Sequence, residues 1–225
     1  MIKELHHVNK VYGGHRLVRY VTVIDPIPPN TIRVRTSDGN TPIKGDYASY
    51  ETATLVQGTT DIYDVYKSGT NFIYLLQGST NVVEIIAANT SNVTNMDSMF
   101  DGCTSLTTVP LFDTSNVTNM QYMFCGCSSL TSVPLFDTSS VAYMYSMFKD
   151  CESLTSVPLF NTSSVINMSL MFYNCLNVES GALALYQQAS TQATPPSYHT
   201  RTFRNCGSNT ETGAAELSQI PSGWK

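Results

Sequence analysis

Charged side chains are scarce in this chain of 225 residues. Only 13% of the residues are Asp, Glu, Lys or Arg, about half of the share that is usual in soluble domains. Ser, Thr, Asn and Gln must therefore supply most of the polar surface, a profile that suits secreted or surface-displayed proteins. The formal net charge of −5 argues against nucleic acid as a partner, because surfaces that bind nucleic acid carry a basic surplus.

The few charges are unevenly distributed along the chain. Residues 1–45 contain seven Lys and Arg against three acids, whereas residues 46–225 contain five against fourteen. An asymmetry of this kind indicates separate modules.

Long apolar runs are also missing. No stretch approaches the roughly 18 apolar residues that a membrane-spanning helix needs, so no membrane insertion is expected. The first residues, MIKELHHVNKVYGG, lack the apolar run of a signal peptide. Two interpretations stay open: a signal has been removed from this chain, or the protein leaves its cell by another route.

Motifs that carry catalysis are absent as well. No serine lies in a GxSxG turn, and no GxxxxGK phosphate loop occurs. His6, His7 and His15 lie near the N-terminus without the carboxylate spacing of a zinc protease. We therefore expect no catalytic residue, no metal site and no cofactor, and we do not expect an enzyme.

Repetition is what the chain has in abundance. Four copies of a 24-residue phrase begin at Asn89, Asp113, Asp137 and Asn161, and a degenerate copy precedes them. The columns that recur at this spacing hold Met96, Met120, Met144 and Met168; Met99, Met123, Met147 and Met171; Phe100, Phe124, Phe148 and Phe172; and Cys103, Cys127, Cys151 and Cys175. A period of this length suits one strand and one compact turn or helical segment in each coil.

The second half of each repeat has the pattern of a short strand. In LTSVPLF, Leu154, Val157 and Leu159 follow the spacing of a strand whose apolar side faces inward. Pro134 and Pro158 lack the N–H that a ladder requires. The strand ladder must therefore be short or interrupted there.

The first half of each repeat has the pattern of a helical turn. In DTSSVAYMYSMF, Asp137 is suited to an Asx-turn or a helix N-cap. The apolar residues that follow have the spacing of one helical face: Val141, Met144, Met147 and Phe148.

The consensus NVTNMxxMFxxCxSLTxVPLFDTS resembles the leucine-rich repeats of bacterial surface proteins, the BspA-like class found in gut and oral bacteria and their phages. The resemblance covers about residues 65–178, in a variant with a 24-residue period. It implies a right-handed leucine-rich solenoid that serves adhesion or recognition, with no catalytic residues to transfer.

The repeats and the resemblance together predict the fold class. We expect an α/β solenoid: a leucine-rich-repeat-like, right-handed coil stack with a short strand and a helical turn in each coil. Residues 1–60 would form a basic β-rich N-terminal module or cap, residues 61–178 the solenoid, and residues 179–225 a C-terminal capping coil with helical insertions.

The two ends of the array carry their own signals. RLVRYVTV (16–23), TIRVRT (31–36), TATLVQ (52–57) and DIYDVY (61–66) are rich in strand-forming residues. Near the C-terminus, Ser180 could N-cap a helix, FRNC (203–206) echoes FYNC (172–175), and Trp224 is expected to cover the open end.

The sulfur-containing columns have a structural interpretation and a chemical one. Parallel Cβ vectors in neighbouring coils make poor disulfide geometry, and free Cys is among the most buried residue types. We favour buried thiols and a core filled by Met and Phe over a metal site. Cys125 and Cys127 form a lone CxC, which is a weak metal signal without further ligands.

Two faces are candidates for ligand binding. Varied positions between the copies bring tyrosines and a lysine together, and tyrosine offers large contact area at low entropic cost. These candidate residues are Tyr122, Tyr143, Tyr145, Lys149 and Tyr173. The other candidate is the strand face, lined by Thr108, Ser132 and Ser156 beside Pro110, Pro134 and Pro158. Solvent-facing drift explains the varied positions equally well.

Two functional hypotheses follow. The first is a non-catalytic recognition or adhesion protein on a bacterial cell surface or outside the cell, which binds a host extracellular protein or glycan. The second is a phage or prophage virion component, a tail or surface attachment protein whose N-terminal module docks to the particle.

Overall fold

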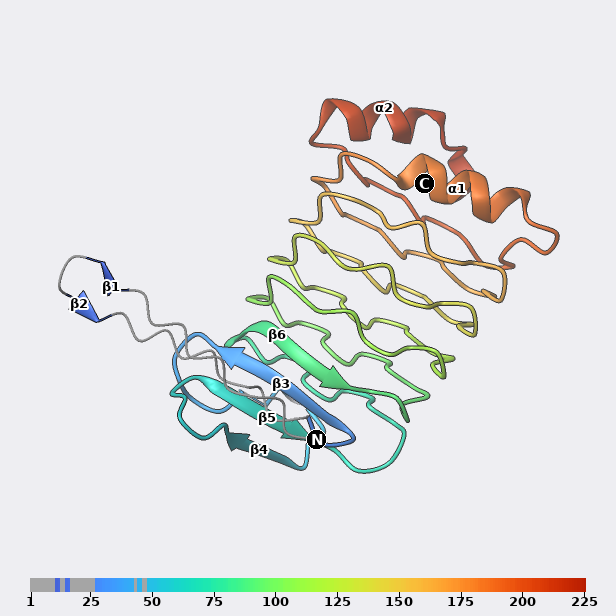
Figure 1. Cartoon of the computed structure of the whole chain (residues 1–225). Coiled ribbons are helices and arrows are strands. Elements are labelled where there is room, and N and C mark those ends of the chain that lie inside the picture. Colours follow the sequence, from blue (N-terminus) through green and yellow to red (C-terminus); the bar gives the residue numbers. More distant parts are fainter. Residues whose placement is uncertain (1–10, 13–14, 17–26, 43, 46–47) are drawn as a thin grey trace.

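The computed structural model describes residues 11–12, 15–16, 27–42, 44–45 and 48–225. Figure 1 shows a small sheet at one end, a stack of irregular coils, and two helices at the far end. The described strands are β1 (Val11–Tyr12), β2 (His15–Arg16), β3 (Thr31–Thr36), β4 (Thr52–Leu55), β5 (Ile62–Tyr66) and β6 (Val82–Asn89). The described helices are α1 (Ala182–Thr191), α2 (Glu211–Gln219) and the 3-10 turn Ser222–Trp224.

The main sheet is antiparallel, with the strand order β4-β5-β3-β6. Alternation in β3 places Ile32 and Val34 in the core. Arg33 is also buried, and its guanidinium donates to both carboxylate oxygens of Asp64 on β5, at 2.7 and 2.8 Å. The bidentate geometry satisfies a charge that would be costly to bury alone.

Three of the four strand predictions for this region are confirmed. Residues 31–36 form β3, and β4 and β5 lie within the segments 52–57 and 61–66. The segment 16–23 lies almost entirely outside the described residues, as do His6 and His7.

Strand β6 links the sheet to the repeats. One edge of β6 pairs with β3, while Glu84 on its other edge forms a parallel bridge with Thr108. The sheet therefore draws two of its four strands, β5 and β6, from residues beyond position 60.

Each 24-residue repeat forms one coil that is hydrogen-bonded to the next. The amide of Met96 donates to the carbonyl of Asn119, and that of Phe100 to Met123, both at 2.9 Å. Equivalent bonds recur along the array, together with isolated parallel bridges. The bridges join Asn71 to Asn95, Asn95 to Asn119, Asn119 to Tyr143, and Tyr143 to Asn167. We call residues 65–178 the repeat stack.

The predicted fold class, an α/β solenoid with a helical turn in each coil and a helical C-terminal cap, is wrong. Regular structure in the described part of the chain is mostly β, centred on the small four-stranded antiparallel sheet, with α1 and α2 as the two α-helices there. Within the repeats, turns stand where helical segments were expected, and most of the single bridges, such as Asn119 with Tyr143, lie in those same segments. The segments expected as strands carry the bridges of Thr108 with Glu84 and of Ser156 with Ser180.

Backbone conformation explains the missing helical turns. Ser146 and Asp150 have φ of 53° and 60°, in the left-handed region that a right-handed helix excludes. The spacing of Met144 and Phe148 therefore comes from consecutive turns. The predicted Asx-turn is confirmed, since the Asp137 carboxylate accepts from the amide of Ser139 at 3.0 Å.

The core of the repeat stack consists of ladders of like side chains. The predicted burial of the Met, Phe and Cys columns is confirmed. One ladder of stacked rings runs through Phe100, Phe124, Phe148, Phe172 and Phe203, with centroids 5.2–6.0 Å apart. A second runs through Phe112, Phe136 and Phe160. All six cysteines are free, and five of them are buried.

The C-terminal segment lies against the last coil (Figure 1). The amide of Phe172 donates to Thr202 at 2.8 Å, so the FRNC echo continues the pattern of the repeats. Gly181, with φ of 97°, precedes α1 in place of the predicted Ser180 cap. Trp224 is buried, and its ring stacks on His199 at 4.1 Å and lies 6.4 Å from Phe203.

Candidate binding surfaces

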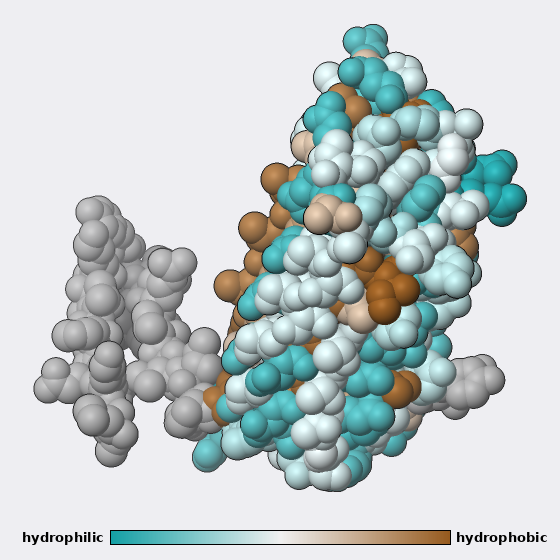
Figure 2. Space-filling view, turned by 90° about the vertical axis from the view of Figure 1, so that its right-hand side faces the viewer, coloured by the Kyte–Doolittle hydropathy of each residue, from teal (hydrophilic) through white to brown (hydrophobic). Residues whose placement is uncertain are grey.

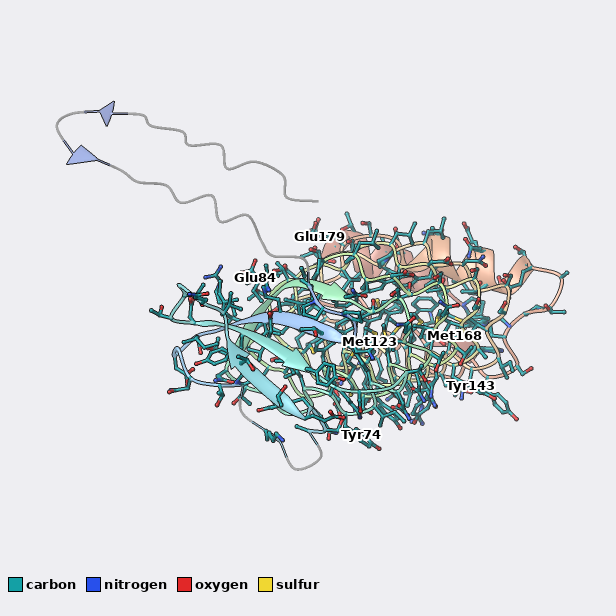
Figure 3. The ribbon with its side chains drawn as sticks, turned by 60° about the horizontal axis from the view of Figure 1, so that its bottom comes forward. Tyr74, Glu84, Met123, Tyr143, Met168 and Glu179 are labelled. Atoms are coloured by element: carbon teal, nitrogen blue, oxygen red, sulfur yellow. The ribbon has the colours of Figure 1, made fainter. Side chains whose placement is uncertain are left out.

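Two exposed faces lie on opposite sides of the repeat stack. Figure 3 shows Tyr74 and Tyr143 along one side, and Glu84 and Glu179 along the other. We call the first the tyrosine face, defined by Tyr122, Tyr143, Tyr145, Lys149 and Tyr173. We call the second the strand face, defined by Thr108, Ser132 and Ser156 with the neighbouring Leu111, Leu135 and Leu159.

A pair of rings forms one part of the tyrosine face. Tyr122 takes a left-handed conformation with φ of 53°, as Tyr74 and Ser98 do at the same position in earlier coils. Its ring meets that of Tyr145 edge-on, with centroids 5.1 Å apart. Burial, and then the hydrogen bond with Tyr145, raises the pKa of Tyr122 to about 12. The phenol therefore stays neutral at physiological pH and keeps its proton as a donor.

A lysine and its partners form the next part of this face. The Lys149 ammonium lies 2.8 Å from the Asp150 carboxylate and 5.9 Å from the centroid of the Tyr173 ring. The hydrogen bond to Asp150 raises the pKa of Lys149, so the cation is retained. Asp150 also accepts from the Asn174 amide at 2.9 Å, and Asn174 accepts from Asn205 at 2.8 Å. This ladder holds the lysine side of the face in place.

Cys125 lies at the position that Lys149 and Tyr173 hold in the next two coils, and its thiol is half-buried. Burial, and then repulsion by Asp101, raises the pKa of Cys125 to about 12. The protonated thiol is a poor nucleophile, so this position contributes contact surface rather than covalent chemistry.

Tyr143 extends the face further along the stack. It occupies the bridging position that Asn119 and Asn167 hold in neighbouring coils, and 42% of its surface is exposed. Ile166 and Tyr198, which are 42% and 61% exposed, follow in the next two coils. These two residues were not among the predicted ones, although Ile166 is the large apolar member of a column with Thr94, Thr118 and Ala142.

Carboxylates beside the tyrosines were also missed. The Asp97 carboxylate accepts a hydrogen bond from the Ser98 hydroxyl at 2.8 Å. Burial raises the pKa of Asp97 above its ordinary value, and the charge of Asp101 adds to the shift. Asp101 in turn accepts from Gln77 at 2.8 Å. The tyrosine face thus combines aromatic rings with both signs of charge.

The strand face has a regular, nearly uniform surface. Thr108, Ser132 and Ser156 are exposed in three successive coils, as predicted. The threonine hydroxyls beside them donate to carbonyls of the preceding coil, from Thr107 to Val83 at 2.9 Å and from Thr155 to Thr131 at 3.2 Å. These bonds fix the threonine side chains at constant spacing along the face.

Leu159 was predicted to face inward together with Leu154 and Val157, and for Leu159 that prediction is wrong. Leu111, Leu135 and Leu159 are 65%, 60% and 51% exposed. The following Phe112, Phe136 and Phe160 are buried instead. In the pattern LxxLxL, Leu154 and Val157 are buried as predicted. The last position is exposed because the chain turns tightly there, where the Phe160 amide donates to the Pro158 carbonyl at 2.9 Å.

Metal binding and membrane insertion are two further possibilities for the residues that the structure describes. Among them, no group of three or more His, Cys, Asp or Glu side chains is placed to hold a metal ion. No described helix is long and apolar enough to cross a membrane.

Comparisons with known proteins bear on the family of this chain. Neither the curated proteins nor the solved structures contain a match. The comparisons do not test the resemblance to BspA-like repeats. Residues 62–184, which are more than half of the chain and include the whole repeat stack, match one protein family. The chain therefore belongs to the family described as Mycoplasma protein of unknown function, DUF285.

Proposed function

We propose that this chain is a non-catalytic recognition and adhesion protein. Its partner would be a host extracellular protein or glycan, and its working place a bacterial cell surface or the space outside the cell. The observation that carries this proposal is the tyrosine face, where the rings of Tyr122 and Tyr145 meet edge-on and the Lys149 ammonium lies 5.9 Å from the centroid of the Tyr173 ring, on a rigid frame.

The frame supports binding because it is ordered before a ligand arrives. Backbone hydrogen bonds join each coil to the next, from Tyr122 N to Tyr145 O at 2.9 Å and from Asp150 N to Tyr173 O at 2.8 Å. A preorganised surface loses little conformational entropy on association. Tyrosine adds large contact area at the cost of two side-chain torsions.

The chemistry of the face suits a partner with mixed polarity. Phenol rings pack on apolar surface and offer a hydroxyl at the rim. Lys149 and Asp150 supply a cation and an anion next to Tyr173. Protein surfaces and glycans both present such combinations of apolar patches and hydrogen-bonding groups.

The test is a binding screen of the full chain against arrays of host glycans and extracellular-matrix proteins. For any ligand found, the double variant Tyr143→Ala/Tyr145→Ala should weaken binding by about tenfold or more, since truncated tyrosines at interface centres typically cost over 1 kcal/mol. The matched control is Leu135→Ser on the opposite face, which should bind as the native chain does.

Other outcomes would count against the proposal. A ligand whose binding ignores the double variant would place recognition elsewhere on the chain. Failure to bind any arrayed ligand at micromolar concentration would contradict adhesion through this face. The alternative of a virion component with an N-terminal docking module would then be the next hypothesis.

A further inference from the structure

A straight apolar stripe runs along the strand face. Leu111, Leu135 and Leu159 occupy the same position in three successive coils, and each exposes half or more of its surface. We call these three residues the leucine stripe. The prolines before them are half-buried and widen the apolar strip. Figure 2 shows hydrophobic side chains that project in a row from one edge of the stack.

Carboxylates lie beside the leucine stripe. Exposed Asp113 and Asp137 follow two residues after the first two leucines, and exposed Glu179 is hydrogen-bonded through its amide to Thr155 at the C-terminal end of the face. Hydrogen bonds from Ser139 lower the pKa of Asp137, so this carboxylate is ionised at neutral pH. Glu84 marks the other end of the face, and its charge is paired with Arg35.

In residues 89–178, which hold the leucine stripe, Lys149 is the one Lys or Arg, and it belongs to the tyrosine face. Arg35 is paired with Glu84 at the sheet end of the strand face, and the remaining described lysines and arginines lie in the sheet region or in the C-terminal segment. The leucine stripe therefore offers an apolar row in a negative surrounding, which is complementary to an apolar row flanked by positive charge.

The distance between successive leucines of the stripe indicates which secondary structure of a partner fits along it. Parallel bridges hold neighbouring coils at about 4.8 Å, and the rings of Phe112, Phe136 and Phe160, which directly follow the leucines, recur at 5.5 and 6.4 Å between centroids. An α-helix laid along the stack presents one apolar row at about 5.4 Å per turn, which lies within this range. An extended strand presents same-face residues about 6.6 Å apart, which is longer than each of these spacings.

We propose that the leucine stripe binds an amphipathic helix of a partner protein, which lies along the repeat stack with apolar residues at i, i+3, i+4 and i+7 against the leucines and with Lys or Arg on its flanks. In this mode of recognition, an amphipathic helix binds through its apolar face. The inference uses the face opposite the tyrosines and does not depend on the function proposed above.

A second copy of the chain fits the stripe less well. When two stripes pack antiparallel about a two-fold axis across the stack, the same side of each face meets its counterpart. The carboxylates of Asp113 and Asp137 would then face the carboxylates of the other copy, and repulsion between like charges disfavours the contact.

The experiment uses the full chain and a designed peptide of about four helical turns, or roughly 15 residues. The peptide carries Leu at i, i+3, i+4 and i+7 and Lys on both flanks, with blocked termini, and its binding is followed by fluorescence anisotropy. Leu135→Ser should weaken binding about tenfold or more, as expected for the loss of one buried leucine. Asp137→Asn should weaken binding less and reduce its salt dependence.

Matched controls distinguish specific binding to the leucine stripe from non-specific binding of the peptide. Tyr143→Ala on the opposite face should bind the peptide as the native chain does. A scrambled peptide of the same composition and a peptide with Glu in place of Lys should both bind at least tenfold more weakly. Circular dichroism and the unfolding midpoint should be unchanged in Leu135→Ser, because the side chain is largely exposed.

Three results would overturn the proposal. The first is equal binding of the peptide by Leu135→Ser and the native chain. The second is equal binding of the designed and scrambled peptides. The third is self-association of the native chain in sedimentation experiments that Leu135→Ser abolishes, which would assign the stripe to a second copy instead.

Discussion

At the scale of single residues, the cysteine column shows how one side chain serves both packing and hydrogen bonding. The thiols of Cys103, Cys127, Cys151 and Cys175 each donate to a carbonyl of the preceding coil, at 3.0–3.1 Å. A buried carbonyl gains a partner, and the sulfur fills the core. The repeated cysteine is thus explained without a disulfide or a metal.

Burial of these thiols predicts a loss of stability at alkaline pH. Burial raises the pKa of Cys103 and Cys206 to about 12 and that of Cys127, Cys151 and Cys175 well above 9.0. Above pH 9 the unfolded chain releases protons that the folded chain retains, so the free energy of unfolding falls as the pH rises. Each thiol contributes at most about 1.4 kcal/mol per pH unit.

Guanidinium unfolding at a series of pH values from 7 to 10.5 measures this effect. The double variant Cys127→Ala/Cys151→Ala should be less stable at pH 7 and should lose stability less steeply above pH 9. An identical slope in the variant and the native chain would contradict the assignment to the thiols.

Left-handed positions give a second prediction at this scale. Gly126 has φ of 69°, and a Cβ built there would lie 3.7 Å from Gly102, whereas a Cβ on Gly181 would lie 2.2 Å from the carbonyl oxygen of Val157. Gly126→Ala should therefore cost only the left-handed penalty of about 1–2 kcal/mol. Gly181→Ala should cost about 3 kcal/mol or more, because backbone must move. Equal unfolding midpoints for the two variants would refute this ranking.

At the scale of the structural element, the repeat stack is organised by ladders of like side chains in successive coils, rather than by helices or strands. Phe148 lies 5.5 Å from Phe124, 5.9 Å from Phe160 and 5.2 Å from Phe172, measured between ring centroids. Each coil is too short to hold its own core. Stability must therefore come from contacts and hydrogen bonds between neighbouring coils.

The matched pair Phe148→Ala and Leu135→Ala tests this view of the ladder. Phe148 is fully buried, and its truncation should lower the free energy of unfolding by about 3–5 kcal/mol. Leu135 is 60% exposed, and its truncation should change stability by no more than about 0.5 kcal/mol. Denaturant unfolding of the two variants decides the matter; a small effect of Phe148→Ala would show that the ladder does not carry the stability.

At the scale of the whole molecule, each end of the repeat stack is bonded to a different kind of structure. The sheet of β3–β6 joins the first coil through the bridge from Glu84 to Thr108. At the far end, the amides of Met168 and Asn174 donate to Tyr198 and Arg204 in the C-terminal segment, both at 2.9 Å. Each end of the stack thus has hydrogen-bonding partners outside the regular repeats.

Deletion of residues 179–225 should produce aggregation or loss of cooperative unfolding. It would expose the rings and thiols of the last coil and leave its amides without these protein partners. Size-exclusion chromatography and thermal unfolding of the truncated chain measure the outcome. A soluble, monomeric and cooperatively folded truncation would contradict the capping role that the sequence predicts for this segment.

The sequence grouped the residues of the tyrosine face, and their role in binding stays a prediction. Comparison of the copies identified Tyr122, Tyr143, Tyr145, Lys149 and Tyr173; the structure pairs the ring of Tyr122 with that of Tyr145 and places Lys149 beside the ring of Tyr173. Residues in one column lie on the same side of the repeat stack, because the period is constant. The contacts between different columns depend on how the chain turns within a coil, and the period does not contain that information.

The sequence alone determined the 24-residue period and the buried Met, Phe and Cys columns, because side chains repeated at a constant spacing must occupy equivalent places in successive coils. Only the tertiary structure decided that Ser146 and Asp150 are left-handed, that the repeats contain no helix within their described residues, and that Leu159 faces solvent. The physical reason is that hydrogen bonds between coils, such as Phe148 to Met171 at 2.9 Å, select these conformations. Local propensity depends on near neighbours in the chain, whereas these bonds join residues a full repeat apart.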